Sequence, residues 1–400
     1  MRFSEIAGDT GLFVDGDWIE TKDQDPNGRV RLIQLADVGA GEFKNKSNKY
    51  ITEAKAAELL CTYLKKGDIL IARLGEPLCK ACVFPCDGLY ITAVDVTILR
   101  VGNKTIEPKY LVYLINSPWF KAQVKRYESG TTRKRISRKN LDRICMNFPS
   151  LPEQKRIVAK IEELFSELDS GVETLKMIKS KVDRYKYSVI DSVLPSENQK
   201  SIADCIKEMG QGWSPKCERV NVVDDDNWAV IKTTAVQPCK FLFDENKALP
   251  SSLAPRERHE IMAGDILITR AGPKSRCGVC CMVRKTKRRL LNCDKVYRLR
   301  LHEDIVLPQY LEYVLNSPAF IQEINLCKTG GNDSGLNLTQ DRFLSIRIPV
   351  PSIKKQEEIV SEIESRRSVC DSIEKTVDAA LQQADALRQS ILKKAFEGKL

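Results

Sequence analysis

Two glycine-containing loops carry the side chains that are best suited to contact a polyanion or the edge of a base. The first loop begins at Gly130 and is basic, with Arg133, Lys134, Arg135 and Arg138. The second begins at Gly330 and offers amides, namely Asn332, Asn337 and Gln340. Arginine pairs with guanine edges and phosphates, whereas asparagine and glutamine pair with adenine. The pattern predicts two DNA contacts of different specificity, and two solvated loops are the alternative.

Further cations lie at turns elsewhere in the chain. Arg284 and Lys285 open a basic run that suits phosphate contact or a plain exposed turn. Arg73 and Arg270 each follow an apolar run that is typical of a strand, and Lys274 comes shortly after the second. A DNA contact and a structural role at the strand end are both open for these two arginines. All five residues are therefore candidates for DNA binding.

Other residue patterns argue against chemistry within this chain. The segments Asn116–Pro118 and Asn316–Pro318 bear a faint similarity to an amino-methyltransferase motif, but helix termination is favoured because no glycine-rich donor loop accompanies them. The chain has two histidines and no phosphate-binding Gly-x-x-x-x-Gly-Lys loop,. The cysteine clusters lack the spacing and partners of a structural zinc site. No catalytic residue, metal or cofactor is expected in this chain.

The two loops are counterparts because the sequence repeats itself. Residues 67–71 (Gly-Asp-Ile-Leu-Ile) return at 264–268, and the helix-like segment 110–118 returns at 310–318. Such periodicity is typical of one structural unit used twice. We expect two α+β lobes with mixed sheets and helices, each followed by a long helix. The expected domains are a first lobe at 1–150, a long helix at 151–195, a second lobe at 196–351 and a second long helix at 352–400.

The long helices show an apolar seam. Seam residues recur at alternating steps of four and three, a period of 3.5 that is typical of coiled coils. The two helices share one register and are separated by a whole lobe, so we expect them to pair antiparallel. The seam consists of Ile157, Ile161, Leu164, Leu168, Leu175, Ile178 and Val182 in the first helix, and of Ile359, Ile363, Ile373, Val377, Leu387 and Ile391 in the second.

The positive charge is concentrated in the lobes. The net charge is +10, whereas residues 153–194 hold eight basic and eight acidic side chains and residues 354–397 hold eight and nine. A basic excess confined to globular regions suits a polyanionic partner. No membrane span or secretory segment is expected, and fourteen cysteines without export signals suggest reduced thiols in the cytoplasm,.

Several segments together resemble the specificity subunit of type I restriction–modification systems. They are the proline-rich steps 148–154 and 350–356 that lead into the long helices, the repeated Gly-Asp-Ile-Leu turns and the Asn-Ser-Pro helices. The similarity covers nearly the whole chain. The first region departs from the pattern, because it lacks a lead-in like that of Ile202–Pro215 in the second.

The resemblance implies that each lobe is a target-recognition domain, which reads one half of a bipartite, asymmetric site in double-stranded DNA. It implies that the coiled coil sets the half-site spacing and docks two methyltransferase subunits, which carry the methyl donor and the catalytic residues. Motor-nuclease subunits would add ATP-driven cleavage, and this chain would be non-catalytic. A stand-alone enzyme acting on nucleic acid, or a coiled-coil scaffold without a DNA role, are the alternatives.

Overall fold

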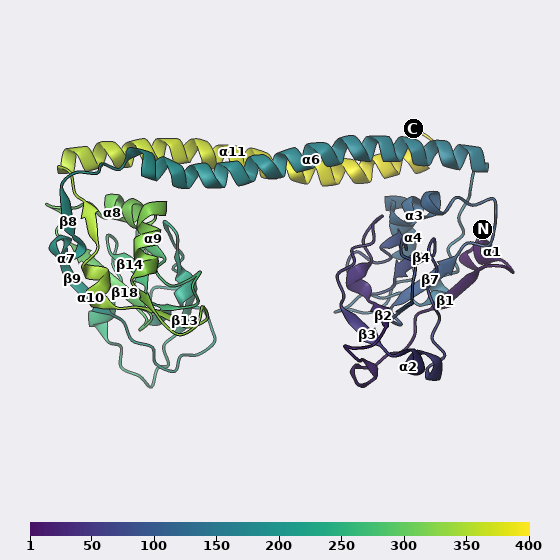
Figure 1. Ribbon diagram of the computed structural model, residues 1–400, viewed down its shortest axis with the longest axis horizontal. Helices are drawn as coiled ribbons and strands as arrows, with labels where there is room; N and C mark the ends of the chain where they lie inside the picture. The colour runs from purple at the N-terminus through teal and green to yellow at the C-terminus, as the bar shows by residue number, and fades with distance from the viewer. The chain divides into compact units, whose positions relative to one another are not determined.

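The computed structural model describes residues 1–400 and divides into two compact units. The first comprises residues 1–175 and 379–400, and the second comprises residues 176–378. Each unit contains one α+β lobe and a part of both long helices (Figure 1). The expected fold class of two mixed lobes and two long helices is confirmed.

The first lobe contains two sheets. The larger sheet has the order β1-β7-β4-β5 and is antiparallel throughout, while the smaller has the order β3-β2-β6 with β2 and β6 parallel. In Figure 1, α3 and α4 lie between the larger sheet and the long helices. The elements are α1 (Phe3–Ala7), β1 (Leu12–Asp15), η1 (Thr21–Asp23), β2 (Val30–Ile33), η2 (Leu35–Asp37), β3 (Lys49–Ile51), α2 (Glu53–Glu58), β4 (Ile69–Ala72), β5 (Ala81–Val83), β6 (Tyr90–Thr92), β7 (Val96–Arg100), α3 (Pro108–Asn116), α4 (Pro118–Val124) and α5 (Arg138–Leu141).

The second lobe repeats this arrangement. Its larger sheet has the order β9-β18-β14-β16, and its smaller sheet β13-β10-β17 again contains one parallel pair. The elements are β8 (Gln199–Ser201), α7 (Ile202–Cys205), β9 (Ile206–Gln211), β10 (Ala229–Ile231), η3 (Thr233–Ala235), β11 (Val236–Gln237), β12 (Lys240–Phe241), β13 (Asn246–Ala248), η4 (Glu257–His259), β14 (Ile266–Thr269), β15 (Ala271–Gly272), β16 (Cys280–Met282), β17 (Leu290–Leu291), β18 (Val296–Leu301), α8 (Pro308–Leu315), α9 (Pro318–Leu326), β19 (Lys328–Thr329), β20 (Leu336–Leu338), α10 (Gln340–Leu344) and β21 (Arg347–Pro349).

The start of the first lobe differs from the expectation. No lead-in was expected in the first region, yet α1 and β1 precede the sheet as α7 and β9 do in the second lobe, and β1 pairs with β7 as β9 pairs with β18. The similarity is hidden in the sequence because both helices are only about one turn long. The internal repeat therefore includes the first strand.

The long helices are α6 (Leu151–Val193) and α11 (Ile353–Phe396), and they run antiparallel within each unit. In the first unit Asp169 forms an ion pair with Arg388. In the second unit Lys186 contacts Asp371 and Glu374, both at 2.7 Å. These contacts join early residues of one helix to late residues of the other.

Burial along the seam is uneven. Ile157, Ile161, Ile359 and Ile363 are buried because the lobes pack onto these ends of the helices. Leu164, Leu168, Leu175 and Val182 are half-buried, and Val377 and Ile391 are buried. Three seam positions remain partly exposed, because a helix pair without a lobe beside it covers its seam incompletely. These positions are Ile178, Ile373 and Leu387, which are 37%, 39% and 51% exposed.

The repeated Gly-Asp turns have a structural cause. Gly67 and Gly264 adopt φ angles of +94° and +92°, a region that favours glycine,. The following Asp68 accepts two hydrogen bonds from the Arg100 guanidinium, both at 2.7 Å. Asp265 forms the matching contact with Arg300 at 3.0 Å. Each turn is thus tied to the central strand of the sheet behind it.

A buried glutamine joins each lobe to its long helix. Gln154 accepts a hydrogen bond from the Glu107 N–H and donates to the carbonyls of Thr105 and Pro149, each at 2.9 Å. Gln356 makes the same three contacts with Leu307, Ile305 and Pro351. The repeat therefore preserves the lobe–helix junction atom for atom.

The Asn-Ser-Pro segments end helices, as expected. Ser117 and Ser317 cap α4 and α9, with a proline in the first turn of each. The amide groups of Asn116 and Asn316 donate to the carbonyls of Ala81 and Cys280 on the edge strands. No helix of the structure is long and apolar enough to cross a membrane.

Candidate nucleic-acid interface

The basic loop of the first lobe closes onto a short antiparallel ribbon, in which Arg135 lies between Ser129 and Leu74. Arg135 and Ser129 exchange backbone hydrogen bonds at 2.9 Å, and Arg135 also bridges to Leu74. The Ile136 N–H donates to the Arg73 carbonyl at 3.0 Å. These contacts place the loop 130–134 and the side chain of Arg135 on the outside of the lobe, where Arg135 is exposed.

The amide loop of the second lobe closes onto an equivalent ribbon of its own, formed by β15, β20 and β19. Asn337 of β20 pairs with Thr329 of β19 and with Ala271 of β15. The Leu338 N–H donates to the Arg270 carbonyl at 2.7 Å, as Ile136 does to Arg73. Asn337 is therefore the structural equivalent of Arg135, and its side chain is exposed too.

Of the two roles left open for Arg73, the structure favours the structural one. Its side chain is only 7% exposed, donates to the carbonyls of Ile136 and Val94, and lies 3.2 Å from Asp15. In this position it holds the ribbon and is not available to a ligand. Arg270 donates in the same way to the Asp294 carbonyl at 2.7 Å, with its guanidinium over the Tyr297 ring. The contacts of both arginines favour the structural role over DNA contact.

The other basic residues of the first loop differ in how they are engaged. Lys134 forms an ion pair with Glu128 at 2.8 Å, and the hydrogen bond to that carboxylate raises the pKa of Lys134. Arg133 is exposed and forms no ion pair, as is also true of Arg135. Arg133 and Arg135 are thus the cations that this loop leaves available to a ligand.

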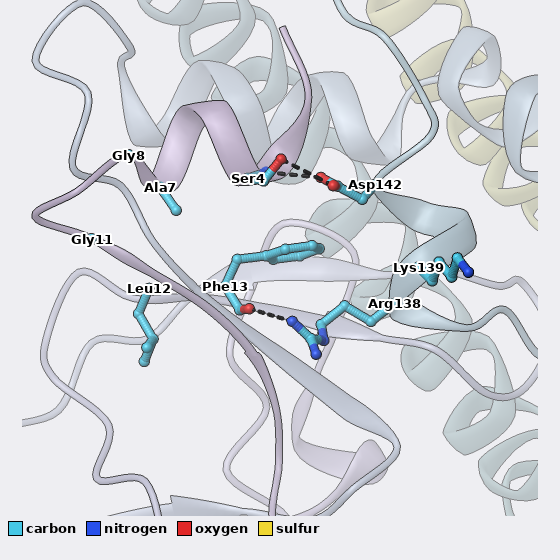
Figure 2. A pocket seen from close by; sticks show the side chains of 9 residues that line it. All are labelled: Ser4, Ala7, Gly8, Gly11, Leu12, Phe13, Arg138, Lys139 and Asp142. Atoms are coloured by element: carbon cyan, nitrogen blue, oxygen red, sulfur yellow. Dashed lines mark hydrogen bonds between the residues drawn. The ribbon is translucent and has the colours of Figure 1, made fainter.

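Arg138 lines a shallow pocket of about 420 Å³ between α1, β1 and α5 (Figure 2). Its guanidinium donates to the Phe13 carbonyl at 2.7 Å, lies over the Phe13 ring and pairs with Asp15 at 3.4 Å. On the other side of the pocket, the N–H and hydroxyl of Ser4 donate to Asp142 at 2.8 and 2.9 Å. Arg138 therefore anchors strand β1, although its side chain remains partly exposed.

The remaining candidates of the second lobe are scattered. Lys274 is exposed beside Asp333 at 3.7 Å, next to the amide loop. Arg284 pairs with the fully buried Glu312 at 2.6 Å, and although burial alone would lower the pKa of Arg284, its hydrogen bond to that carboxylate raises it. A structural role accounts for this arginine. The other three, Lys285, Asn332 and Gln340, are exposed.

One further group of cations was not predicted from the sequence. Lys232, Lys247 and Lys295 line a shallow cleft of about 360 Å³ beside the small sheet of the second lobe. Lys232 pairs with Glu245 at 3.6 Å, while Lys247 and Lys295 are exposed. Lys49 occupies the place of Lys247 in the first lobe, since Leu32 faces Lys49 as Val230 faces Lys247. The presence of lysine at both equivalent positions, 49 and 247, is the sequence signal that predicts this group.

These surfaces are suited to binding. They present guanidinium, ammonium and amide groups, which pair with phosphates and base edges.

All fourteen cysteines are free thiols, and burial raises the pKa of Cys79 and Cys82 to about 12. No group of three or more His, Cys, Asp or Glu side chains is arranged to hold a metal ion.

The chain thus combines two like α+β lobes with two long helices, and each lobe presents its own set of exposed polar side chains. Residues 11–179 match the type I restriction modification DNA specificity domain. The sequence is 38% identical over 195 residues to the EcoEI specificity subunit of Escherichia coli, covering 48% of this chain and 33% of that protein. It is 27% identical over 316 residues to the EcoKI subunit of E. coli K12, covering 74% and 67%. The match to the first relative thus spans only about a third of its length.

Solved structures share the fold. A chain from a structure described as the basis of complex assembly and conformational transition of the type I R-M system has a TM-score of 0.72 at 18% identity, over 100% of this chain and 97% of that one. The HsdS subunit from Thermoanaerobacter tengcongensis has a TM-score of 0.51 at 17% identity, over 100% and 96%. The chain is thus similar in sequence to specificity subunits of type I restriction enzymes, and it shares its fold with an HsdS subunit.

Proposed function

We propose that this chain is the DNA-recognition subunit of a type I restriction–modification complex, in which each lobe binds one half of a bipartite, asymmetric site. The observation that carries the proposal is the exposed part of the repeat. Sheet order, turns and lobe–helix junctions recur, whereas the ribbon residue is Arg135 in one lobe and Asn337 in the other. Two copies of one framework with different exposed chemistry suit two different half-sites.

The long helices support a spacer role. They contain 43 and 44 residues without a break, about 65 Å of helix each at 1.5 Å per residue,. We propose that this helix pair sets the distance between the half-sites and docks two methyltransferase subunits. Exposed apolar side chains on the helices, including Met177, Tyr185 and Val369, offer surface for a protein partner,.

We propose that catalysis belongs to the partners. The methyltransferase subunits would carry the methyl donor and modify adenine, and motor-nuclease subunits would use ATP for cleavage. This chain would be non-catalytic and hold no cofactor. The cytoplasmic location stays a prediction.

The test is to co-express the chain with a methyltransferase subunit and to map the methylated DNA sites by sequencing. We expect one bipartite site with unlike halves. Replacing residues 1–150 by another family member's lobe should change one half only, and lengthening both helices by a heptad should change only the spacer. Methylation by the purified chain alone would contradict the non-catalytic role, and a simultaneous change in both halves would contradict the modular one.

A further inference from the structure

The ribbon offers one position at which the two lobes differ in chemistry while their backbones agree. Arg135 bridges to Ser129 and Leu74, and Asn337 bridges to Thr329 and Ala271. Two neighbouring side chains are alike in kind, because Ser129 corresponds to Thr329 and the buried Ile136 corresponds to the buried Leu338. The flanking residues differ, but the backbone framework that carries the guanidinium or the amide is shared.

The support beneath this position is also shared. The carbonyl of Arg73 accepts from Ile136 and that of Arg270 accepts from Leu338, and both arginine side chains donate to a carbonyl at the same place in the fold, that of Val94 or Asp294. The ribbon is thereby fixed to the larger sheet in both lobes. A side chain on a rigid support loses little freedom on binding, which suits a residue that must discriminate between bases.

The loop that closes the ribbon does not disturb it. Four residues separate Gly130 from Arg135, whereas six separate Gly330 from Asn337, yet the same backbone pairs form on both sides. Residues within the loop, such as Arg133 and Asn332, have no common frame across the lobes. Arg135 and Asn337 do have one, so they are the pair whose identities can be compared.

We infer that the residue at this ribbon position selects a base, guanine through Arg135 in one half-site and adenine through Asn337 in the other. This inference rests on the proposed DNA-reading function. Arginine donates two hydrogen bonds to O6 and N7 of guanine, and asparagine pairs with N6 and N7 of adenine, so each residue distinguishes its base in the major groove. Neither side chain is held by an ion pair within the lobe, so both are free to make these contacts.

The experiment uses the full chain with its methyltransferase subunit and a randomised pool of duplex DNA. Arg135→Asn should change the preferred base at one position of one half-site from guanine to adenine. Asn337→Arg should make the reverse change in the other half-site. Discrimination at the changed position should shift on the order of ten- to hundred-fold.

Two further variants separate base reading from phosphate contact. Arg135→Lys keeps the charge but not the forked donor, so it should weaken the guanine preference while leaving the salt dependence of binding unchanged. Arg143→Asn removes an exposed arginine of the same lobe outside the ribbon and should leave the selected sequence unchanged. Folding of each variant is checked by its melting temperature, which these exposed substitutions should not alter.

The outcomes distinguish the two claims. If the unmodified complex selects a bipartite site and Arg135→Asn selects the same one, the inference is wrong and the proposed function stands. The inference also fails if Arg135→Asn weakens binding to all sequences equally with a smaller salt slope, as expected of a phosphate contact. If the unmodified complex selects no sequence, the proposed function itself fails.

Discussion

Removing Arg284 should destabilise the second unit, because this arginine neutralises a buried carboxylate. Glu312 is fully buried and accepts hydrogen bonds from the Met282 N–H at 2.6 Å and from the guanidinium at 2.6 and 3.1 Å. Arg284→Ala would leave that charge without its partner. Breaking a buried pair typically costs about 3–5 kcal/mol.

The expected loss lies at the lower end of that range. The Arg284 side chain is 42% exposed, so water can reach the vacated place and partly solvate the carboxylate. We expect a loss of about 3 kcal/mol. In a unit of roughly 200 residues this lowers the melting temperature by about 6–12 °C, at 2–4 °C per kcal/mol. Scanning calorimetry of the full chain should show this shift in the transition of the second unit.

A double variant tests the cause. Val112 occupies the place of Glu312 in the first lobe and is buried there, so this fold accepts an apolar side chain at that position. Arg284→Ala with Glu312→Val should regain most of the lost stability, since replacing a buried pair by apolar residues is often neutral. Arg288→Ala, an exposed arginine nearby, is the matched control and should shift stability by less than about 0.5 kcal/mol,. An unchanged melting temperature for Arg284→Ala, together with weaker DNA binding, would refute this reasoning and restore Arg284 as a DNA contact.

Two further perturbations probe the framework. Gln356→Leu removes three buried hydrogen bonds at the lobe–helix junction and should cost the second unit about 3 kcal/mol,; hydrogen exchange should rise first at the start of α11, and equal protection there would contradict the proposed role. Burial by itself would raise the pKa of Asp37. The hydrogen bonds that its carboxylate accepts from Ser47, Gln34 and Lys46 outweigh burial and lower this pKa below the usual 3.8. The carboxylate therefore stabilises the folded state above about pH 4, and this contribution is lost as the pH falls through the lowered pKa. Asp37→Asn should cost about 2–3 kcal/mol in urea unfolding at pH 7, with a smaller difference at pH 3, and a difference independent of pH would show that the charge is not responsible.

The sequence predicted those features that depend on local spacing. The 3.5-residue period gave the long helices, and the Gly-Asp turns and Asn-Ser-Pro segments gave the ends of strands and helices. These features depend on residues that are close along the chain. Burial of Arg73 could not be predicted in this way, because its partners Asp15, Val94 and Ile136 lie 21 to 63 residues away. The exposure of Ile178 and Leu387 likewise depends on how far the lobes cover the helices.

The fold allows the exposed side chains of the two lobes to differ without loss of stability. Stability in each lobe comes from contacts behind the ribbon, such as the Asp68–Arg100 and Asp265–Arg300 pairs and the buried glutamines of the junctions. None of these groups reaches the exposed position held by Arg135 or Asn337. A substitution there removes no buried contact, so its folding cost should be small, within about 0.5 kcal/mol for an exposed site. Under the proposed function, selection for a new half-site can therefore act on this position while the framework stays constant. This agrees with a repeat that preserves the contacts of the Gly-Asp turns and of the two junction glutamines but not the exposed ribbon residue.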